Sequence, residues 1–259
     1  MSRERPDFLR TNGVTFALPS VVGSYLTRPA YPEALLAATD SLAVGDGPVL
    51  ELGCGPGLVA RDLASRGRQV VAVDPSEGMI ALAQSLSRDG SSKVRWICSS
   101  AEDFDYADSY GLVAAVMSLH WMEWDVVMPA IRRSLAPGAR LAIVTANPRP
   151  VPWGERLTPL IAEYSTIRNW VAHDLLDLLV EGGYFVREGT ATFDSTWESH
   201  VEAYVESFHA RSGFAREWMG EERAEEFDTR LRALLAEHGV ESSVRIEETY
   251  VLTWGRPTG

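Results

Sequence analysis

The stretch VLELGCGPGLVARDLASRGRQVVAVDPS, residues 49–76, places the strongest constraint on how this chain folds. An apolar segment leads into three glycines, a segment of helical composition follows, and a second apolar segment, VVAV, ends at Asp74. Continuous apolar segments are typical of parallel strands that are buried on both faces. The stretch therefore predicts a β-α-β unit, with a strand that opens at 49–50, a helix over 58–65 and a second strand over 69–73.

Strand and helix alternate in the same way through roughly the first 146 residues. Ser76 can cap a helix that runs to about Arg88, and Asp125 can cap a later helix in which Pro129 lies near the first turn. This alternation predicts an α/β fold with a doubly wound, mostly parallel, Rossmann-like sheet. Seven strands are expected in all, and those beyond the first two are placed at 94–98, 112–117, 140–145, 185–193 and 244–253.

The second half of the chain departs from this alternation. Residues 147–153 carry three prolines and predict a loop, and helices are expected over 157–170 and 173–180. Ser195 with Glu198 fits a capping box that starts a further helix. Two amphipathic helices between two late strands indicate a lid rather than a layer of the sheet. We therefore expect an N-terminal helical cap segment (1–48), a core built on the α/β sheet (49–195 and 244–259) and an inserted helical lid (196–243).

Charge and cysteine content restrict the partners that this chain can have. A formal charge of -12 disfavours nucleic acid, whose phosphates are usually met by a Lys/Arg surface. No segment approaches 18 uninterrupted apolar residues, so no membrane span is expected. Cys54 and Cys98 are too few for a disulfide framework, and no metal-ligand spacing occurs. We expect a cytoplasmic protein, a monomer or homodimer, that acts on a small molecule without nucleic acid, membrane or metal.

The spacing of the glycines separates three kinds of nucleotide-binding turn. A phosphate-binding P-loop requires GxxxxGK[ST], and no lysine follows here. A dinucleotide fingerprint requires GxGxxG, whereas Gly53, Gly55 and Gly57 give GxGxG, preceded by Glu51. A carboxylate beside the turn disfavours a pyrophosphate and favours a cationic or zwitterionic ligand. Asp74, at the end of the next strand, is placed to accept hydrogen bonds from ribose hydroxyls.

At these residues the chain resembles the class I S-adenosylmethionine-dependent methyltransferases, whose first motif, E/D-x-G-x-G-x-G, is matched by residues 51–57. The resemblance continues at VVAVDPSEGMI, SSAEDF, SLHWMEW and LAPGARLAIV, and covers roughly residues 20–146. Within the family the chain is most similar to the small-molecule branch that includes trans-aconitate methyltransferase. The resemblance implies methyl transfer from S-adenosyl-L-methionine, with S-adenosyl-L-homocysteine as product.

The resemblance also implies which residues bind this cofactor. The glycines would let the backbone approach its methionine portion, Glu51 would lie near its ammonium group, and Arg28 would pair with its carboxylate. Asp74 would bind the ribose. Ser100 stands where relatives often carry Asp, which leaves open which side chain reads the adenine amine. The full expected set is Arg28, Glu51, Gly53, Cys54, Gly55, Gly57, Asp74, Pro75, Met79, Ser100, Ala101, Glu102 and Ser118.

By the family's geometry, the loop SLHWMEWD, residues 118–125, faces the transferable methyl group. The sulfonium is already a strong electrophile, so the protein mainly aligns it with the nucleophile. A carboxylate acceptor needs no base, whereas a hydroxyl or an ammonium must lose a proton, and His120 is the candidate to take it. A histidine that only packs at the end of a strand is the alternative. The expected substrate-binding set is Tyr25, His120, Trp121, Trp124 and Trp153.

Enzymes that methylate amide or base nitrogens commonly carry [DNS]PP[YFW] in this loop, and the motif is absent here. The missing motif argues against methylation of nucleic-acid amino groups. We expect methylation of a small molecule on oxygen or a carboxylate, ahead of methylation on nitrogen or carbon, and the aromatic late segments suggest the tailoring of a secondary metabolite. Two other functions stay open. The fold could use the cofactor's charge to promote a rearrangement or cyclisation, or it could be a module that senses the cofactor.

Overall fold

The computed structural model describes residues 13–87, 93–168 and 174–258. Its centre is a seven-stranded sheet in the order β3-β2-β1-β4-β5-β7-β6. All neighbours pair in parallel except β7, which runs antiparallel to both β5 and β6. The predicted doubly wound, mostly parallel sheet is therefore confirmed. The strands are β1 (Val49–Leu52), β2 (Val70–Asp74), β3 (Val94–Cys98), β4 (Leu112–Val116), β5 (Leu141–Pro148), β6 (Phe185–His200) and β7 (Ser243–Pro257).

Helices cover both faces of this sheet. One face packs against α3 (Glu33–Ser41), α4 (Leu58–Ser65) and α5 (Glu77–Leu86), and the other against α6 (Trp124–Ser134) and α8 (Leu175–Glu181). Side chains along β1 alternate between the two cores, and β1, β2 and β4 are buried throughout. Burial on both faces explains why these strands read as continuous apolar segments in the sequence.

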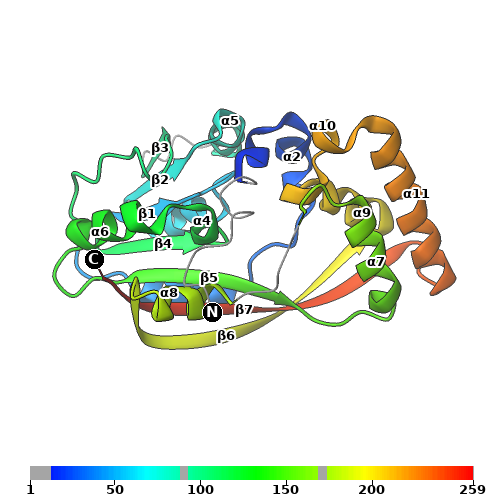
Figure 1. Cartoon of the computed structure of the whole chain (residues 1–259). Coiled ribbons are helices and arrows are strands. Elements are labelled where there is room, and N and C mark those ends of the chain that lie inside the picture. Colours follow the sequence, from blue (N-terminus) through cyan, green and yellow to red (C-terminus); the bar gives the residue numbers. More distant parts are fainter. Residues whose placement is uncertain (1–12, 88–92, 169–173, 259) are drawn as a thin grey trace.

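A separate group of helices lies at one end of the sheet. It comprises α7 (Gly154–Tyr164), α9 (Val201–His209), α10 (Arg216–Met219) and α11 (Glu221–Glu237), together with the N-terminal α2 (Pro19–Ser24). Figure 1 shows β6 and β7 running past the other strands toward these helices. The N-terminal end of β7 packs with α7, α9 and α11 in a third hydrophobic core, separate from the two that flank the sheet. The long β6–β7 ribbon thus leads to the helices of the region expected to form a lid (196–243).

The expected capping box at Ser195 and Glu198 is wrong. Both residues lie in β6, which continues to His200 and pairs with β7 along its whole length, and the helix begins only at Val201. Burial alternates residue by residue from Gly189 onward, as it does in a strand with one covered face. Ladder hydrogen bonds to β7 outweigh the local capping preference because the chain there has a strand partner available.

Two further boundaries differ from expectation. Asn147 and Pro148 extend β5 rather than starting a loop, and they pair with β7 where β4 has already ended. Proline is tolerated there because that side of β5 has no ladder partner to lose. Asp125 does not cap α6 but lies in its first turn, where its carboxylate accepts a hydrogen bond from the Tyr184 hydroxyl at 2.6 Å.

Other local predictions are confirmed. Ser76 caps α5, and its hydroxyl accepts a hydrogen bond from the Met79 amide at 3.2 Å. The helix expected over 157–170 is observed as α7, which ends at Tyr164; residues 169–170, and the start at His173 of the next expected helix, lie outside the described residues. In the part of the chain that is described, no helix combines the length and apolarity that a membrane span requires.

Candidate active site

The glycine turn after β1 is forced into a left-handed backbone. Gly53, Gly55 and Gly57 have φ angles of 69°, 52° and 72°. A Cβ atom on Gly53 would lie 2.5 Å from the Cβ of Ser118, and one on Gly57 would lie 2.2 Å from the ring of Trp96. Two of the glycines are therefore required by packing as well as by conformation. Gly55 instead faces the hydroxyl of Tyr25, and both Gly53 and Gly55 line a cavity.

We predict that Gly57→Ala lowers stability by several kcal/mol, since it adds a clash with the ring of Trp96 to the strain of a positive φ. Gly239→Ala is the matched control. Gly239 has the same φ of 72° as Gly57 but nothing within 4 Å of the added methyl group, so it costs only about 1–2 kcal/mol of backbone strain. Urea unfolding of the two variants checks this. Equal losses of stability in the two variants would show that packing against Trp96 does not contribute to the effect of Gly57→Ala.

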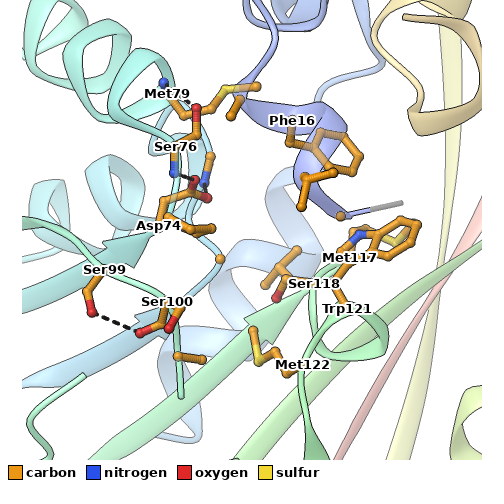
Figure 2. Close-up of a pocket in the computed structure, with 18 of the residues that line it drawn as sticks. Phe16, Asp74, Ser76, Met79, Ser99, Ser100, Met117, Ser118, Trp121 and Met122 are labelled. Carbon is orange, nitrogen blue, oxygen red and sulfur yellow. Dashed lines mark hydrogen bonds between the residues drawn. The ribbon is translucent and has the colours of Figure 1, made fainter. Parts of the chain in front are cut away.

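A cavity of about 390 Å³ lies at the carboxyl ends of β1, β2 and β4. Figure 2 shows Asp74, Ser76 and Met79 on one side of it, with Phe16, Met117 and Trp121 on the other. The N-terminal segment covers it through the 3-10 helices η1 (Gly13–Ala17) and η2 (Tyr25–Thr27). Ligands of open α/β sheets bind at this edge. Of the expected site residues, it is lined by Tyr25, Arg28, Gly53, Gly55, Asp74, Pro75, Met79, Ser100, Ala101, Glu102, Ser118 and Trp121.

Asp74 holds the glycine turn and the start of α5 together. One carboxylate oxygen accepts a hydrogen bond from the Gly55 amide at 2.8 Å, and the other accepts from the Ser76 amide at 2.9 Å. Burial raises its pKa, although both of these hydrogen bonds act to lower it. A carboxylate has about four acceptor positions, so two remain for donors inside the cavity. A ribose has two adjacent hydroxyls that match them.

Glu51 is buried in β1 beneath the glycine turn, with only 2% of its surface exposed. Among the described residues its Oε2 atom is the buried side-chain oxygen or nitrogen that has no hydrogen-bond partner. Burial raises its pKa to about 8, the backbone amide of Ala60 acts to lower it, and the negative charge of Asp74 adds to the rise. An unpaired buried carboxylate is costly and is stabilised by a cation brought beside it.

The loop after β4 is fixed at two points. The Ser118 hydroxyl donates to the Leu52 carbonyl at 2.6 Å, which ties the loop to the end of β1. The Glu123 amide donates to Glu102 at 2.7 Å, which ties it to the segment after β3. Met117, directly before Ser118, has a φ of 54°, a strained value for a residue other than glycine. Such strain often marks positions where a side chain must be aimed at a ligand.

At the other end of the cavity, Ser100 and Glu102 both lie on the wall, as does Ala101. The Ser100 hydroxyl is directed to Asp103 at 2.8 Å, and one oxygen of Glu102 is occupied by the Glu123 amide. The second Glu102 oxygen has no hydrogen bond to a described residue and remains available to a donor in the cavity. Met79, only 1% exposed, packs in a small core with Val21 and also lines the cavity.

Several expected site residues lie elsewhere. Trp124 donates from Nε1 to the Leu119 carbonyl at 2.9 Å and belongs to the core beneath the loop. Trp153 donates to the Tyr204 hydroxyl at 3.3 Å and belongs to the lid core. Neither lines the cavity, so the structure does not support a substrate-wall role for them. Glu51, Cys54 and Gly57 are buried in or beneath the turn and do not line the cavity, although Gly53 and Gly55 beside them do.

His120 lies on a neighbouring cavity of about 510 Å³. Met117 and Trp121 line both cavities, and the rings of His120 and Trp121 pack with centroids 4.4 Å apart. His120 is therefore beside the cavity that holds Asp74 rather than on its wall. Sequence analysis missed Phe16, Ser76, Ser99, Met117 and Met122 on that wall. Of these, Ser76 could have been found from the sequence, because the capping pattern already placed it at the start of the helix that follows Asp74.

Comparison with known proteins places the strand ends that form this cavity, but not the N-terminal residues that cover it, in a known domain. A family described as "Methyltransferase domain" matches residues 49–138. The chain is 34% identical over 139 residues to N-demethylindolmycin N-methyltransferase from Streptomyces griseus, covering 52% of this chain and 54% of that protein. The chain thus spans about half the length, or less, of the curated relatives that it matches.

Solved structures extend the likeness beyond this domain. A putative type II methyltransferase from Anaeromyxobacter dehalogenans superposes with a TM-score of 0.63 and 26% identity, covering 88% of this chain and 97% of that one. The [4+2]-cyclase SpnF superposes with a TM-score of 0.52 and 22% identity, covering 90% of this chain and 84% of that one. The second likeness concerns the fold alone. It shows that this fold also occurs in a cyclase.

Proposed function

Because the chain belongs to the class I S-adenosylmethionine-dependent methyltransferases, we propose that it transfers the methyl group of S-adenosylmethionine to a small-molecule acceptor. The bound cofactor supplies a methyl group on a positively charged sulfur. The protein's part is to fix the cofactor, to exclude water and to hold the acceptor's nucleophilic atom in line with the carbon–sulfur bond that breaks.

The unpaired Glu51 carboxyl is the observation that carries this proposal. The cofactor has an ammonium group, which would stabilise the ionised form of Glu51 at the place where the protein provides no partner. Asp74 has acceptor positions left for the two ribose hydroxyls, and Glu102 has an oxygen left for the adenine amine. Arg28, on the same wall, is proposed to hold the carboxylate end of the cofactor.

For the acceptor we propose oxygen methylation, with a carboxylate as the leading nucleophile. The titratable side chains on the described part of the cavity wall are Tyr25, Arg28, Asp74 and Glu102, and the last two are assigned above to the nucleoside. Burial raises the pKa of Tyr25, so none of the described residues on that wall is suited to deprotonate an acceptor, and a carboxylate does not need a base. The Streptomyces griseus relative is named for N-methylation, so methylation of an amine is the result that would overturn the proposal of oxygen methylation.

The test is to incubate the protein with S-adenosylmethionine carrying a deuterated methyl group and a panel of acids, phenols and amines. We expect S-adenosylhomocysteine to be released and the label to appear in an acid or phenol. Release of the label into an amine would move the proposal to nitrogen. Tight binding of the cofactor without release of S-adenosylhomocysteine for any acceptor would favour the second candidate, a rearrangement or cyclisation, which the likeness to SpnF keeps open.

His120 is proposed as the base only where the acceptor is a hydroxyl or an ammonium. We predict that His120→Ala lowers turnover of such an acceptor by about 100-fold at neutral pH and leaves a carboxylate acceptor unaffected. His200→Ala, at an exposed histidine on the far end of β6, is the control. Steady-state rates with one acceptor of each kind decide the matter. Full turnover of a hydroxyl acceptor by His120→Ala would exclude the role.

A further inference from the structure

The N-terminal segment that covers the cavity assigned to the cofactor is too short to hold its own shape. Its helix α2 has six residues, and Leu18 before it offers no side-chain cap. The 3-10 helix η2 that follows has three residues. Isolated helices of this length are unstable in water, so contacts with other elements must fix the segment. Because Tyr25 and Arg28 of this segment lie on the cavity wall, those contacts also set the shape of the site.

Two serines of α2 are bound by carboxylates from the second half of the chain. Ser20 and Ser24 are four residues apart, which places them on one face of the helix. The Ser24 hydroxyl donates a hydrogen bond to Glu206 of α9. The hydroxyl of Ser20 and its backbone amide both donate to Glu217 of α10. Both of these helices contact α2 and lie beside it in Figure 1. Hydrogen bonds to a carboxylate are roughly twice as strong as those between neutral groups.

The Glu206 carboxylate is itself fixed by a network between α9, α10 and α11. Its second oxygen accepts a hydrogen bond from Nη2 of Arg216 at 2.8 Å, and the same nitrogen lies 3.3 Å from Oδ2 of Asp228. The other oxygen of Asp228 lies 2.8 Å from Nε2 of His209, whose side chain is fully buried. The acceptor that Ser24 meets is therefore held in place before the N-terminal segment packs against it.

Ser24 connects this network to the cavity wall. It is only 3% exposed and directly precedes Tyr25. The Tyr25 hydroxyl lies against the glycine turn, where it would be 3.5 Å from a Cβ atom on Gly55. The Arg28 guanidinium packs over the Tyr25 ring, 5.1 Å from its centroid, and the Arg28 amide donates to the Tyr25 carbonyl at 3.2 Å. A shift of Ser24 thus displaces both side chains from the wall.

We propose that Glu206, acting through Ser24, is a positioning residue for the cofactor, because it holds Tyr25 and Arg28 in their places over the cavity. This rests on the proposed function, in which the cofactor occupies that cavity and Arg28 binds its carboxylate. Without this tie, binding must also order the segment, and the affinity falls by the fraction of molecules in which the segment is already in place. The loss concerns the amino acid part of the ligand, since Asp74 binds the nucleoside from the opposite wall.

The test compares two ligands by calorimetry: S-adenosylhomocysteine, and methylthioadenosine, which has the same nucleoside but lacks the amino acid part. We expect Glu206→Ala and Ser24→Ala each to weaken S-adenosylhomocysteine binding about tenfold and to leave methylthioadenosine binding nearly unchanged. The double variant should lose no more than Glu206→Ala alone, because both changes remove the same hydrogen bond. Glu206→Gln keeps an oxygen for the Ser24 hydroxyl and should lose less than Glu206→Ala.

Glu202→Ala is the matched control. Glu202 lies on the same helix, and its carboxylate pairs with Arg232 of α11 at 2.7 Å instead of with the N-terminal segment. This variant should bind both ligands as the wild type does. Urea unfolding of every variant shows whether it is folded. Should Glu206→Ala fail to fold, Ser24→Ala decides, because it removes a single oxygen atom.

The outcomes separate the positioning role from the function on which it rests. Wild-type affinity for S-adenosylhomocysteine in the folded variants would overturn the positioning role. Equal weakening of both ligands, or losses that multiply in the double variant, would overturn it too. If the wild type binds S-adenosylhomocysteine and the variants bind it equally well, only the positioning role fails. If the wild type does not bind it, the proposed function fails.

Discussion

Replacing Glu51 with glutamine is expected to make the ligand-free protein more stable at pH 8 and, at the same pH, to weaken its binding of S-adenosylhomocysteine. Both effects come from the unpaired Glu51 carboxylate, which destabilises the ligand-free protein when it ionises and attracts the ammonium group of the bound ligand. Burial raises the pKa of Glu51 to about 8, so the folded protein resists ionising a group that the unfolded chain ionises near pH 4.5. The bound ammonium group would supply the missing partner.

The pH dependence follows from this shift. A carboxyl whose pKa is raised on folding binds more protons in the folded state, so its contribution to stability falls as pH rises between about 4.5 and 8. Each pKa unit corresponds to roughly 1.4 kcal/mol, so the total reaches several kcal/mol. Glu51→Gln should remove this slope and coincide with the wild type below pH 4.5.

Urea unfolding of the ligand-free protein at several pH values measures this effect, with Glu77→Gln as the control. Glu77 is an exposed carboxylate in the first turn of α5, and its removal should leave the wild-type slope intact. Calorimetry with S-adenosylhomocysteine in buffers of different ionisation enthalpy should also show that the wild type releases about one proton at pH 7, and that Glu51→Gln releases none. Parallel stability curves for wild type and Glu51→Gln would refute the assignment.

Asp74→Asn is expected to weaken the binding of S-adenosylhomocysteine by about 100-fold or more. The carboxylate is proposed to accept from two ribose hydroxyls, and hydrogen bonds to a charged group contribute about 1.5–3 kcal/mol each. An asparagine keeps the shape but places an NH2 group where either the ribose or a backbone amide of Gly55 or Ser76 now donates. Calorimetry on the two proteins measures the loss.

A purely structural effect of Asp74→Asn is excluded by a second ligand. The 2′-deoxy form of S-adenosylhomocysteine lacks one of the two hydroxyls, so wild type should bind it at least tenfold more weakly than the parent compound. In Asp74→Asn this difference should largely disappear, because the partner of that hydroxyl is gone. If the variant discriminates between the two ligands as strongly as the wild type, Asp74 does not hold the ribose.

The sheet could be predicted from the sequence because its strands are coded locally. Continuous apolar segments such as VVAV arise from burial on both faces, and the glycine spacing records backbone angles that other residues adopt only with strain. The end of β6 could not be predicted in this way. Residues 194–200 contain a good capping pattern, and only the presence of β7 alongside them makes them a strand.

The same distinction applies to the site. Gly53, Gly55 and Asp74 lie within one β-α-β unit, so their spacing already places them together. Phe16 reaches the cavity from the N-terminal segment and packs on Trp121 with centroids 5.8 Å apart, a contact between distant parts of the chain. Trp124 shows the reverse error. The aromatic residues of its loop suggested that it would line the substrate pocket, but in the first turn of α6 its side chain packs in the core.

A crystal structure of the complex with S-adenosylhomocysteine tests the central claim most directly. We predict that both ribose hydroxyls lie within hydrogen-bond distance of the Asp74 carboxylate, and that the amino group lies near the Oε2 atom of Glu51, which then has a partner. The sulfur should face Met117 and the open space below the lid. A nucleoside bound in the neighbouring cavity with His120, or a Glu51 carboxyl still without a partner, would contradict the account.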